Sequence, residues 1–152
     1  MRMSKGVEAA LHCCVVMHWL DGRPVTSAQL AEFFALPPAY LQKTLRALVS
    51  DGVAHAARGQ AGGFTLARAA ESISLMDVVS AVEGREAAFQ CEEIRLDGRS
   101  GTLGSRSGPC AIAHAMHRAE LTYRRALMAE SVADVADQTG SGVRDRTVAA
   151  LV

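Results

Sequence analysis

The sequence predicts a mainly α-helical protein with a small β-wing, in which a winged helix-turn-helix DNA-binding domain is joined to a long dimerisation helix. Three observations predict this fold class. Two helical segments with apolar periodicity flank a break at Leu36-Pro37-Pro38. Two short β-type runs follow them and are joined by a glycine-rich turn. A further long helical segment with a mostly apolar stripe begins at Pro109.

The composition indicates a globular chain with one or two small packed units, because 49% of its 152 residues are hydrophobic. No apolar run approaches the roughly 20 residues that span a bilayer, and the amino terminus leads into no signal-peptide core. We therefore expect a soluble, cytoplasmic protein. In that compartment the four cysteines are expected to be thiols or metal ligands rather than disulfides.

The helix-turn-helix has recognisable starts and stops. Thr26 and Ser27 form a capping pair before its first helix. That helix ends at Leu36-Pro37-Pro38, because proline lacks an amide donor and disfavours helical backbone in the residue before it. The second helix runs over residues 39–49 and is stopped by Asp51-Gly52. A first helix, which Ser4 can cap and which runs to about Trp19, has an apolar face suited to packing against the helix-turn-helix.

The remaining elements divide the chain into four expected segments. The winged domain covers residues 1–84 and includes strands at 53–57 and 63–66 and a helix from about Ser74 to Val82, which Gly84 ends. Residues 85–108 lack hydrophobic periodicity and predict a long loop. The dimerisation helix region covers 109–137, with a short helix near 132–136. A flexible tail is expected at 138–152.

The second helix of the pair is the expected reader of DNA, because its polar residues lie off the apolar stripe near its start. The alternative is an ordinary solvated helix face. The wing favours DNA, since Arg58 and Gln60 accompany glycines that let the backbone approach phosphates. The candidate DNA-contacting residues are Thr26, Ser27, Pro38, Ala39, Tyr40, Gln42, Lys43, Arg46, Arg58, Gln60 and Gly62.

The distribution of charge agrees with this assignment, although the whole chain has no net charge. Residues 1–68 hold seven basic and four acidic side chains, a net charge of +3, and the remainder holds nine basic and twelve acidic ones, a net charge of −3. A positive first half is modest support for nucleic-acid binding.

Four residues are candidates for a sensor. Glu8 and His12 are four positions apart, so on a helix both project from one face, where they can hold a metal ion or form a surface hydrogen-bonded pair. Cys91 and Cys110 flank the long loop. The start of a helix favours thiolate over thiol at Cys110, which helps both metal ligation and redox reactivity.

The other cysteines and an enzymatic role were weighed as alternatives. Adjacent residues on a helix point in different directions, so Cys14 is assigned to the core while Cys13 stays open. Cys110 with His114 could serve as nucleophile and base, but no orienting third group or oxyanion site accompanies them, so we expect no enzyme. A cluster-free regulator switched by Cys91 and Cys110 oxidation or by a small ligand remains an alternative, and an interaction module without DNA would leave the reader's polar residues unexplained.

The chain resembles the bacterial winged-helix regulators that include the iron–sulfur regulator IscR, the nitric-oxide sensor NsrR and the redox regulator RsrR. The resemblance covers roughly residues 1–130 and rests on the first helix, on Pro38-Ala39-Tyr40-Leu41, on the wing at 59–66, on 74–79 and on 110–114. It implies a homodimer whose long helices cross and whose two readers bind a palindromic operator, acting as a transcriptional repressor.

The same resemblance implies an iron–sulfur cluster in the loop at 85–108. Many members use three cysteines there, whereas this chain has only Cys91 and Cys110. Residues 6–14 are similar to the RsrR branch, which holds a [2Fe–2S] cluster with two cysteines, one histidine and one glutamate. Carried over by position, the ligands are Glu8 and His12 of one subunit with Cys91 and Cys110 of the other, and His114 is the reserve ligand.

Overall fold

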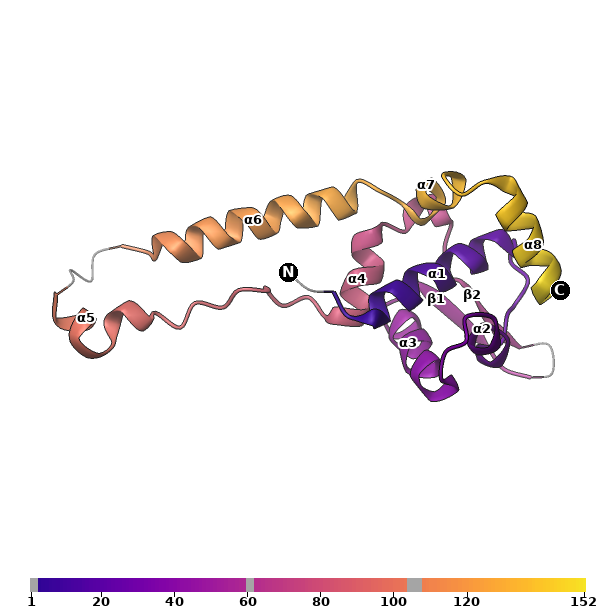
Figure 1. Ribbon diagram of the computed structural model, residues 1–152, viewed down its shortest axis with the longest axis horizontal. Helices are drawn as coiled ribbons and strands as arrows, with labels where there is room; N and C mark the ends of the chain where they lie inside the picture. Colours follow the sequence, from indigo (N-terminus) through magenta and orange to yellow (C-terminus); the bar gives the residue numbers. More distant parts are fainter. Residues whose placement is uncertain (1–2, 60–61, 104–107) are drawn as a thin grey trace. The chain divides into compact units, whose positions relative to one another are not determined.

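The computed structural model describes residues 3–59, 62–103 and 108–152 (Figure 1). The chain divides into two compact units. One contains the residues up to Arg85 together with Leu127–Val152, and the other contains Glu86–Ala126. The carboxy-terminal segment therefore belongs to the unit that holds the winged helix. Within the described residues, no helix combines the length and the apolarity that crossing a bilayer requires.

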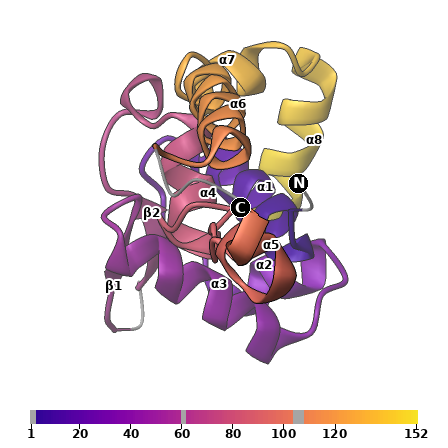
Figure 2. The same ribbon diagram turned by 90° about the vertical axis from the view of Figure 1, so that its left-hand side faces the viewer.

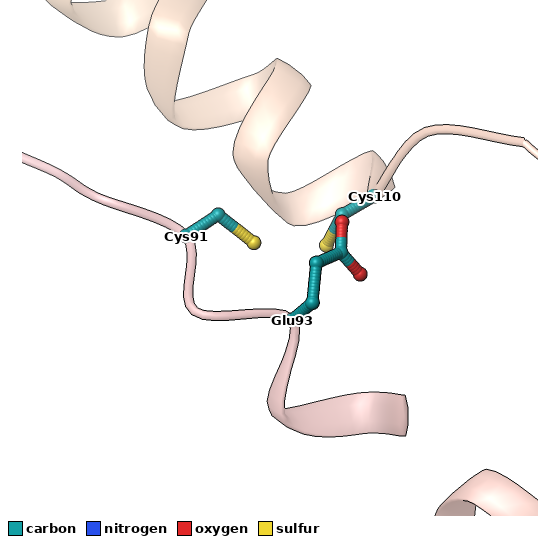
Figure 3. A group of neighbouring side chains, drawn as sticks. All are labelled: Cys91, Glu93 and Cys110. Carbon is teal, nitrogen blue, oxygen red and sulfur yellow. The ribbon is translucent and has the colours of Figure 1, made fainter. Parts of the chain in front are cut away.

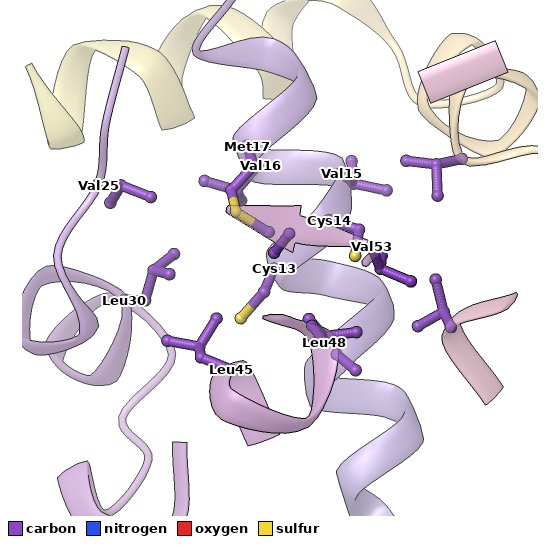
Figure 4. Packing of buried hydrophobic residues seen from close by; sticks show 14 of the residues in the cluster. Cys13, Cys14, Val15, Val16, Met17, Val25, Leu30, Leu45, Leu48 and Val53 are labelled. Atoms are coloured by element: carbon purple, nitrogen blue, oxygen red, sulfur yellow. The ribbon is translucent and has the colours of Figure 1, made fainter. Parts of the chain in front are cut away.

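Helix α1, Lys5–Trp19, is the centre of the first unit. It contacts α3 on one side and α7 on the other (Figures 1 and 2). Ala10, Cys13 and Cys14 are completely buried along it. Figure 4 shows the side chains of Cys13 and Met17 among residues from neighbouring segments, such as Leu45. A helix that is covered on several sides has to be apolar around most of its circumference, as this one is.

The helix-turn-helix forms as predicted from its caps and its proline break. Helix α2, Ser27–Phe33, is preceded by Thr26, whose Oγ1 accepts a hydrogen bond from the Gln29 amide at 3.2 Å. Gln29 Oε1 accepts one in return from the Thr26 amide at 2.9 Å, which completes a capping box. Helix α3, Pro38–Ser50, begins on a proline and is followed by Gly52 at φ 72°.

The wing is an antiparallel pair of strands, β1 Ala54–Ala57 and β2 Gly63–Leu66, as predicted. Val25 extends the pair through two backbone bonds with Phe64, of 3.1 and 2.8 Å. A Cβ atom on Gly63 would lie 2.8 Å from the Val25 carbonyl oxygen, so only glycine permits this close approach. The wing is thereby fixed to the chain that enters α2.

Helix α4, Leu75–Glu83, follows the 3₁₀ turn η1, Ala70–Ser72. Ser74 caps it in a second capping box with Asp77, and Gly84 ends it at φ 88°, as predicted. Arg68 donates to the Ser72 carbonyl and forms an ion pair with Asp77 at 3.2 Å. Met76 and Val79 pack against α1 at Val7.

The prediction of a flexible tail at 138–152 is wrong, because Ser141–Leu151 form helix α8. Thr147 is buried, and Val148 and Leu151 pack against the core. The preceding helix α7, Val132–Asp137, is predicted correctly and is anchored where the Val132 amide donates to the Ile73 carbonyl at 2.9 Å. The chain between these helices is short, so α8 is held close to α1, which it contacts.

The second unit contains the long helix α6, Ala111–Met128, up to Ala126, and the helix is close to its predicted bounds. The region 85–108 was expected to lack helices, but it contains the 3₁₀ turn η2, Ile94–Leu96, and the short helix α5, Gly98–Leu103. These two elements are too short to produce a periodic pattern of apolar residues in the sequence. Glu120 is buried on α6 and accepts from the Ala88 amide at 3.1 Å and from Arg124 at 2.8 Å, so it fixes the extended segment beside this helix.

Candidate DNA interface and thiol site

Helix α3 presents a polar face and a buried face. Leu41, Leu45 and Leu48 are fully buried. Gln42, Lys43 and Arg46 are exposed as expected, and the described part of the chain offers none of the three a hydrogen bond or an ion pair. Long side chains that are exposed and unpaired in the free protein are available to base edges and phosphates.

Tyr40 departs from the expected outward orientation. Its side chain is half-buried, and its hydroxyl oxygen is buried with no hydrogen-bond partner among the described residues. The hydroxyl lies beside α1, where a Cβ on Gly6 would be in ordinary van der Waals contact with it at 3.6 Å. Tyr40 therefore links α1 to the start of α3.

Replacing Tyr40 by phenylalanine is expected to raise the free energy of unfolding by about 1 kcal/mol, because it removes a buried hydroxyl that has no partner. Chemical denaturation measures this change. Operator binding in a gel shift should stay the same, whereas a Tyr40 that contacts DNA through its hydroxyl would lose affinity. A lower stability of the Tyr40→Phe protein would show that the hydroxyl has a stabilising hydrogen-bond partner.

The other predicted DNA contacts occupy varied positions. Pro38 and Ala39 are exposed in the first turn of α3. Thr26 is exposed, although its hydroxyl is engaged in the capping box, and Ser27 is half-buried. The remaining contacts belong to the wing: Arg58 is exposed and Gly62 is half-buried, while Gln60 lies outside the described residues.

Glu8 and His12 lie one turn apart on α1 and are both exposed, as their spacing predicts. They line a pocket of about 640 Å³ together with Lys5, Ala9, Phe34, Leu36, Pro37 and Tyr40. The His12 ring lies 5.7 Å from the Phe34 ring. This pocket joins α1 to the turn that leads into α3.

Cys91 and Cys110 lie together in the second unit, although 18 residues separate them in the sequence. Their sulfur atoms and a carboxylate oxygen of Glu93 all lie within 4.8 Å of one another (Figure 3). Cys91 is exposed and Cys110 is half-buried. Glu93 is absent from the ligands proposed from the sequence, and the only signal for it is its position two residues after Cys91.

The surroundings of Cys110 favour its thiolate form. The amide of Ala113 is the main cause that holds the pKa of this thiol below its usual value, and the Ile112 amide, the Cys91 thiol and nearby Arg95 act in the same direction. These amides belong to the first turn of α6, where donors are free. The expected effect of the helix start is thus present in the structure.

The remaining sulfur and imidazole candidates have other surroundings. Burial raises the pKa of Cys13 to about 12 and also raises that of Cys14, so both are core residues that resist ionisation. His114 Nδ1 lies 2.6 Å from Arg118 Nη1. Glu8 and His12 belong to one unit, whereas Cys91 and Cys110 belong to the other.

Comparisons with known proteins identify the family. Residues 3–138 match the family model described as Rrf2, iron-dependent transcriptional regulator. The chain belongs to the Rrf2 family of transcriptional regulators. The HTH-type transcriptional regulator YffB of Lactococcus lactis is 34% identical over 140 residues, which cover 91% of this chain and 89% of YffB. IscR of an Escherichia coli strain is 30% identical over 115 residues, covering 76% of this chain and 66% of IscR.

Solved Rrf2-like structures have the same fold. CymR of Bacillus subtilis, called the global cysteine regulator, has a TM-score of 0.71 at 18% identity, covering 92% of this chain and 99% of that one. IscR of T. potens has a TM-score of 0.64 at 16% identity, covering 93% and 90%. These likenesses confirm the predicted winged-helix fold class. The relatives are named as transcriptional regulators, which is a non-enzymatic role and agrees with the expectation that this Rrf2 chain is no enzyme.

Proposed function

We propose that the protein is a homodimeric, cytoplasmic Rrf2 repressor that binds a palindromic DNA operator and senses redox state through an iron–sulfur cluster of the [2Fe–2S] type. The observation that carries the sensing role is the Cys91–Cys110 pair, which is already assembled and favours thiolate at Cys110. Thiolates are the ligands that iron–sulfur clusters require.

DNA binding is assigned to α3 and the wing. The polar face at Gln42, Lys43 and Arg46 enters the major groove, and Arg58 on the wing contacts the phosphate backbone. The exposed and unpaired state of these side chains supports this assignment. A palindromic operator follows from two-fold symmetry, because two identical readers require two identical half-sites.

Dimerisation is assigned to α6. Ile112 is 67% exposed and Met116 is 42% exposed on its apolar stripe, which an isolated chain would leave in water. A second copy of the same helix covers this stripe with apolar contacts, and the contact is isologous.

The proposed cluster ligands are Glu8 and His12 of one subunit with Cys91 and Cys110 of the other. The donors fit the group, since two thiol sulfurs lie within reach of one ion and Glu8 and His12 are exposed on one face of α1. When bound, the cluster supplies one-electron chemistry, and its imidazole and carboxylate ligands make binding sensitive to protonation. His114 remains the reserve ligand.

The route from this sensor to DNA passes through α1. Helix α1 contacts α3, and the pocket beside Glu8 and His12 is lined by Pro37 and Tyr40 at the start of α3. A change in how Glu8 and His12 are held therefore acts on the position of the reading helix. In a dimer it alters the spacing of the two readers.

Replacing His12 by alanine tests the ligand set. In anaerobically purified protein, we expect the visible absorbance of the cluster to be lost or clearly shifted, because one iron loses its imidazole. His117→Ala is the matched control, since His117 is also exposed, and its spectrum should equal that of the unmodified protein. An unchanged His12→Ala spectrum would exclude His12 as a ligand.

A second candidate function keeps the regulator and removes the cluster. The Cys91 and Cys110 sulfur atoms lie within 4.8 Å of each other, so a disulfide could form between them after a small movement. CymR of Staphylococcus aureus, a protein of similar fold, was solved in an oxidised form. An iron and sulfide assay on fresh protein, combined with a count of free thiols after oxidation, separates the two functions.

A further inference from the structure

The group formed by Cys91, Glu93 and Cys110 comes entirely from one chain. Glu93 reaches toward Cys110, and the Cys91 side chain points toward the same space (Figure 3). The three ligand atoms lie within 4.8 Å of one another. This group requires neither α1 nor a second subunit, and so it differs from the ligand set proposed for the cluster.

Arg95 holds the two segments of this group together. Its Nε donates to Glu93 Oε2 at 2.7 Å, and its Nη2 donates to the Gly108 carbonyl at 2.9 Å, two residues before Cys110. The ion pair occupies one oxygen of the Glu93 carboxylate and leaves Oε1 for another partner. Carboxylates that bind a metal ion with one oxygen are commonly hydrogen-bonded in this way through the other.

The distances suit a single metal ion. Metal–sulfur bonds of about 2.3 Å and metal–oxygen bonds of about 2.1 Å in a tetrahedral site place neighbouring ligand atoms roughly 3.6–3.8 Å apart. The present separations, of at most 4.8 Å, need to close by about 1 Å. Two exposed or half-buried cysteines in a surface segment can make this movement by rotating their side chains.

The charges are balanced as well. Two thiolates and one carboxylate carry three negative charges, and a divalent ion with the adjacent Arg95 guanidinium supplies three positive ones. Thiolate ligands select zinc, cobalt or iron over magnesium or calcium. Three protein ligands leave the fourth position of a tetrahedral site open to water or to an exogenous molecule.

We propose that Cys91, Glu93 and Cys110 of each chain bind one divalent transition-metal ion, such as Zn²⁺ or Co²⁺, when the cluster is absent. The backbone at Glu93 supports this role. It adopts φ 53° and ψ 36°, a left-handed conformation that is uncommon for residues other than glycine and that directs this side chain back toward the cysteines.

A cobalt titration of reduced, metal-free protein under anaerobic conditions tests the proposal. We expect one Co²⁺ per chain, with a sulfur-to-cobalt charge-transfer band and the intense d–d bands of a tetrahedral site, and displacement by Zn²⁺. Glu93→Gln should weaken Co²⁺ binding by at least the roughly tenfold loss that follows removal of even an outer-shell partner. Glu92→Gln is the matched control, because Glu92 is exposed and adjacent.

The outcomes distinguish this site from the cluster. Equal Co²⁺ affinity in Glu93→Gln and in unmodified protein would overturn the proposal. Loss of Co²⁺ binding in His12→Ala with full binding in Glu93→Gln would also overturn it and would favour the ligands of the cluster. The His12→Ala protein should otherwise bind Co²⁺ normally, whatever happens to its cluster absorbance, so the two proposals can fail separately. Far-ultraviolet circular dichroism verifies that each variant is folded.

Discussion

Replacing Met116 by glutamate on α6 is expected to convert the dimer into monomers and to lower operator affinity by about 10²–10⁴-fold. Met116 lies within the apolar stripe and is 42% exposed in the single chain. In an isologous contact through this stripe, the introduced carboxylate of each chain would be buried against the apolar side chains of the partner helix. Burying such charges without partners costs several kcal/mol, which opposes association of the two helices.

The loss of DNA affinity follows from the loss of the linked second reader. When one half-site is occupied, the partner's reader binds in an effectively intramolecular step, and this advantage is worth about 10²–10⁴ in affinity. A monomer loses it while each α3 helix stays intact. Sedimentation velocity reports the oligomeric state, and a gel shift with operator DNA reports the affinity.

His117→Glu is the control for this experiment. It introduces the same charge at the adjacent position, where His117 is exposed and lies off the predicted stripe. This variant should remain a dimer and bind DNA with nearly unchanged affinity. A Met116→Glu protein that stays dimeric would show that α6 is not the interface.

The parts of the fold that could be predicted are those determined by a few neighbouring residues. The capping boxes at Thr26 and Ser74 need only the residue three positions ahead, and Pro38 and Gly52 fix the ends of α3 through backbone chemistry alone. The wing was predictable for the same reason, because a glycine-rich turn between short β-type runs is a local signal.

The errors arise where distant residues decide the outcome. Tyr40 packs inward beside Gly6 of α1, 34 positions earlier in the sequence, and no local pattern reports such a contact. The segment of helix α8 was predicted to be a flexible tail because it begins with polar residues and glycines. Val148 and Leu151 are enough to hold it as a helix, because they pack on a core that is already formed.

The candidate site shows the same division. The spacing of Glu8 and His12 on one helix face could be predicted, since a four-residue interval is a property of the helix itself. The proximity of Cys91 and Cys110 was indicated only by their positions on either side of a loop. Glu93 is held beside the two cysteines by Arg95, which donates one hydrogen bond to Glu93 and another to the Gly108 carbonyl. A contact of this kind has no periodic signature in the sequence.

Replacing Lys43 or Arg58 by alanine is expected to weaken operator binding for all sequences and to make it less dependent on salt. Each residue that neutralises one phosphate contributes about 0.9 to the slope of log affinity against log salt, and a dimer contains each residue twice. The slope should therefore become shallower by about 2 for each substitution. Both side chains are exposed without a partner among the described residues, so neither substitution removes a contact that stabilises the fold.

Gln42→Ala provides the contrast that locates base recognition. If Gln42 forms a bidentate contact with adenine, its loss should cost about 1–3 kcal/mol of discrimination at one base pair of each half-site while the salt dependence is unchanged. Arg144→Ala on α8 removes one exposed charge elsewhere and should change neither property. Gel shifts over a range of salt, with matched and mutated operators, separate phosphate contacts from base contacts. If Lys43→Ala, Gln42→Ala and Arg144→Ala had the same operator affinity, salt dependence and base discrimination, α3 would not read DNA. A reading helix makes these variants differ, because a phosphate contact, a base contact and a distant charge contribute differently to binding.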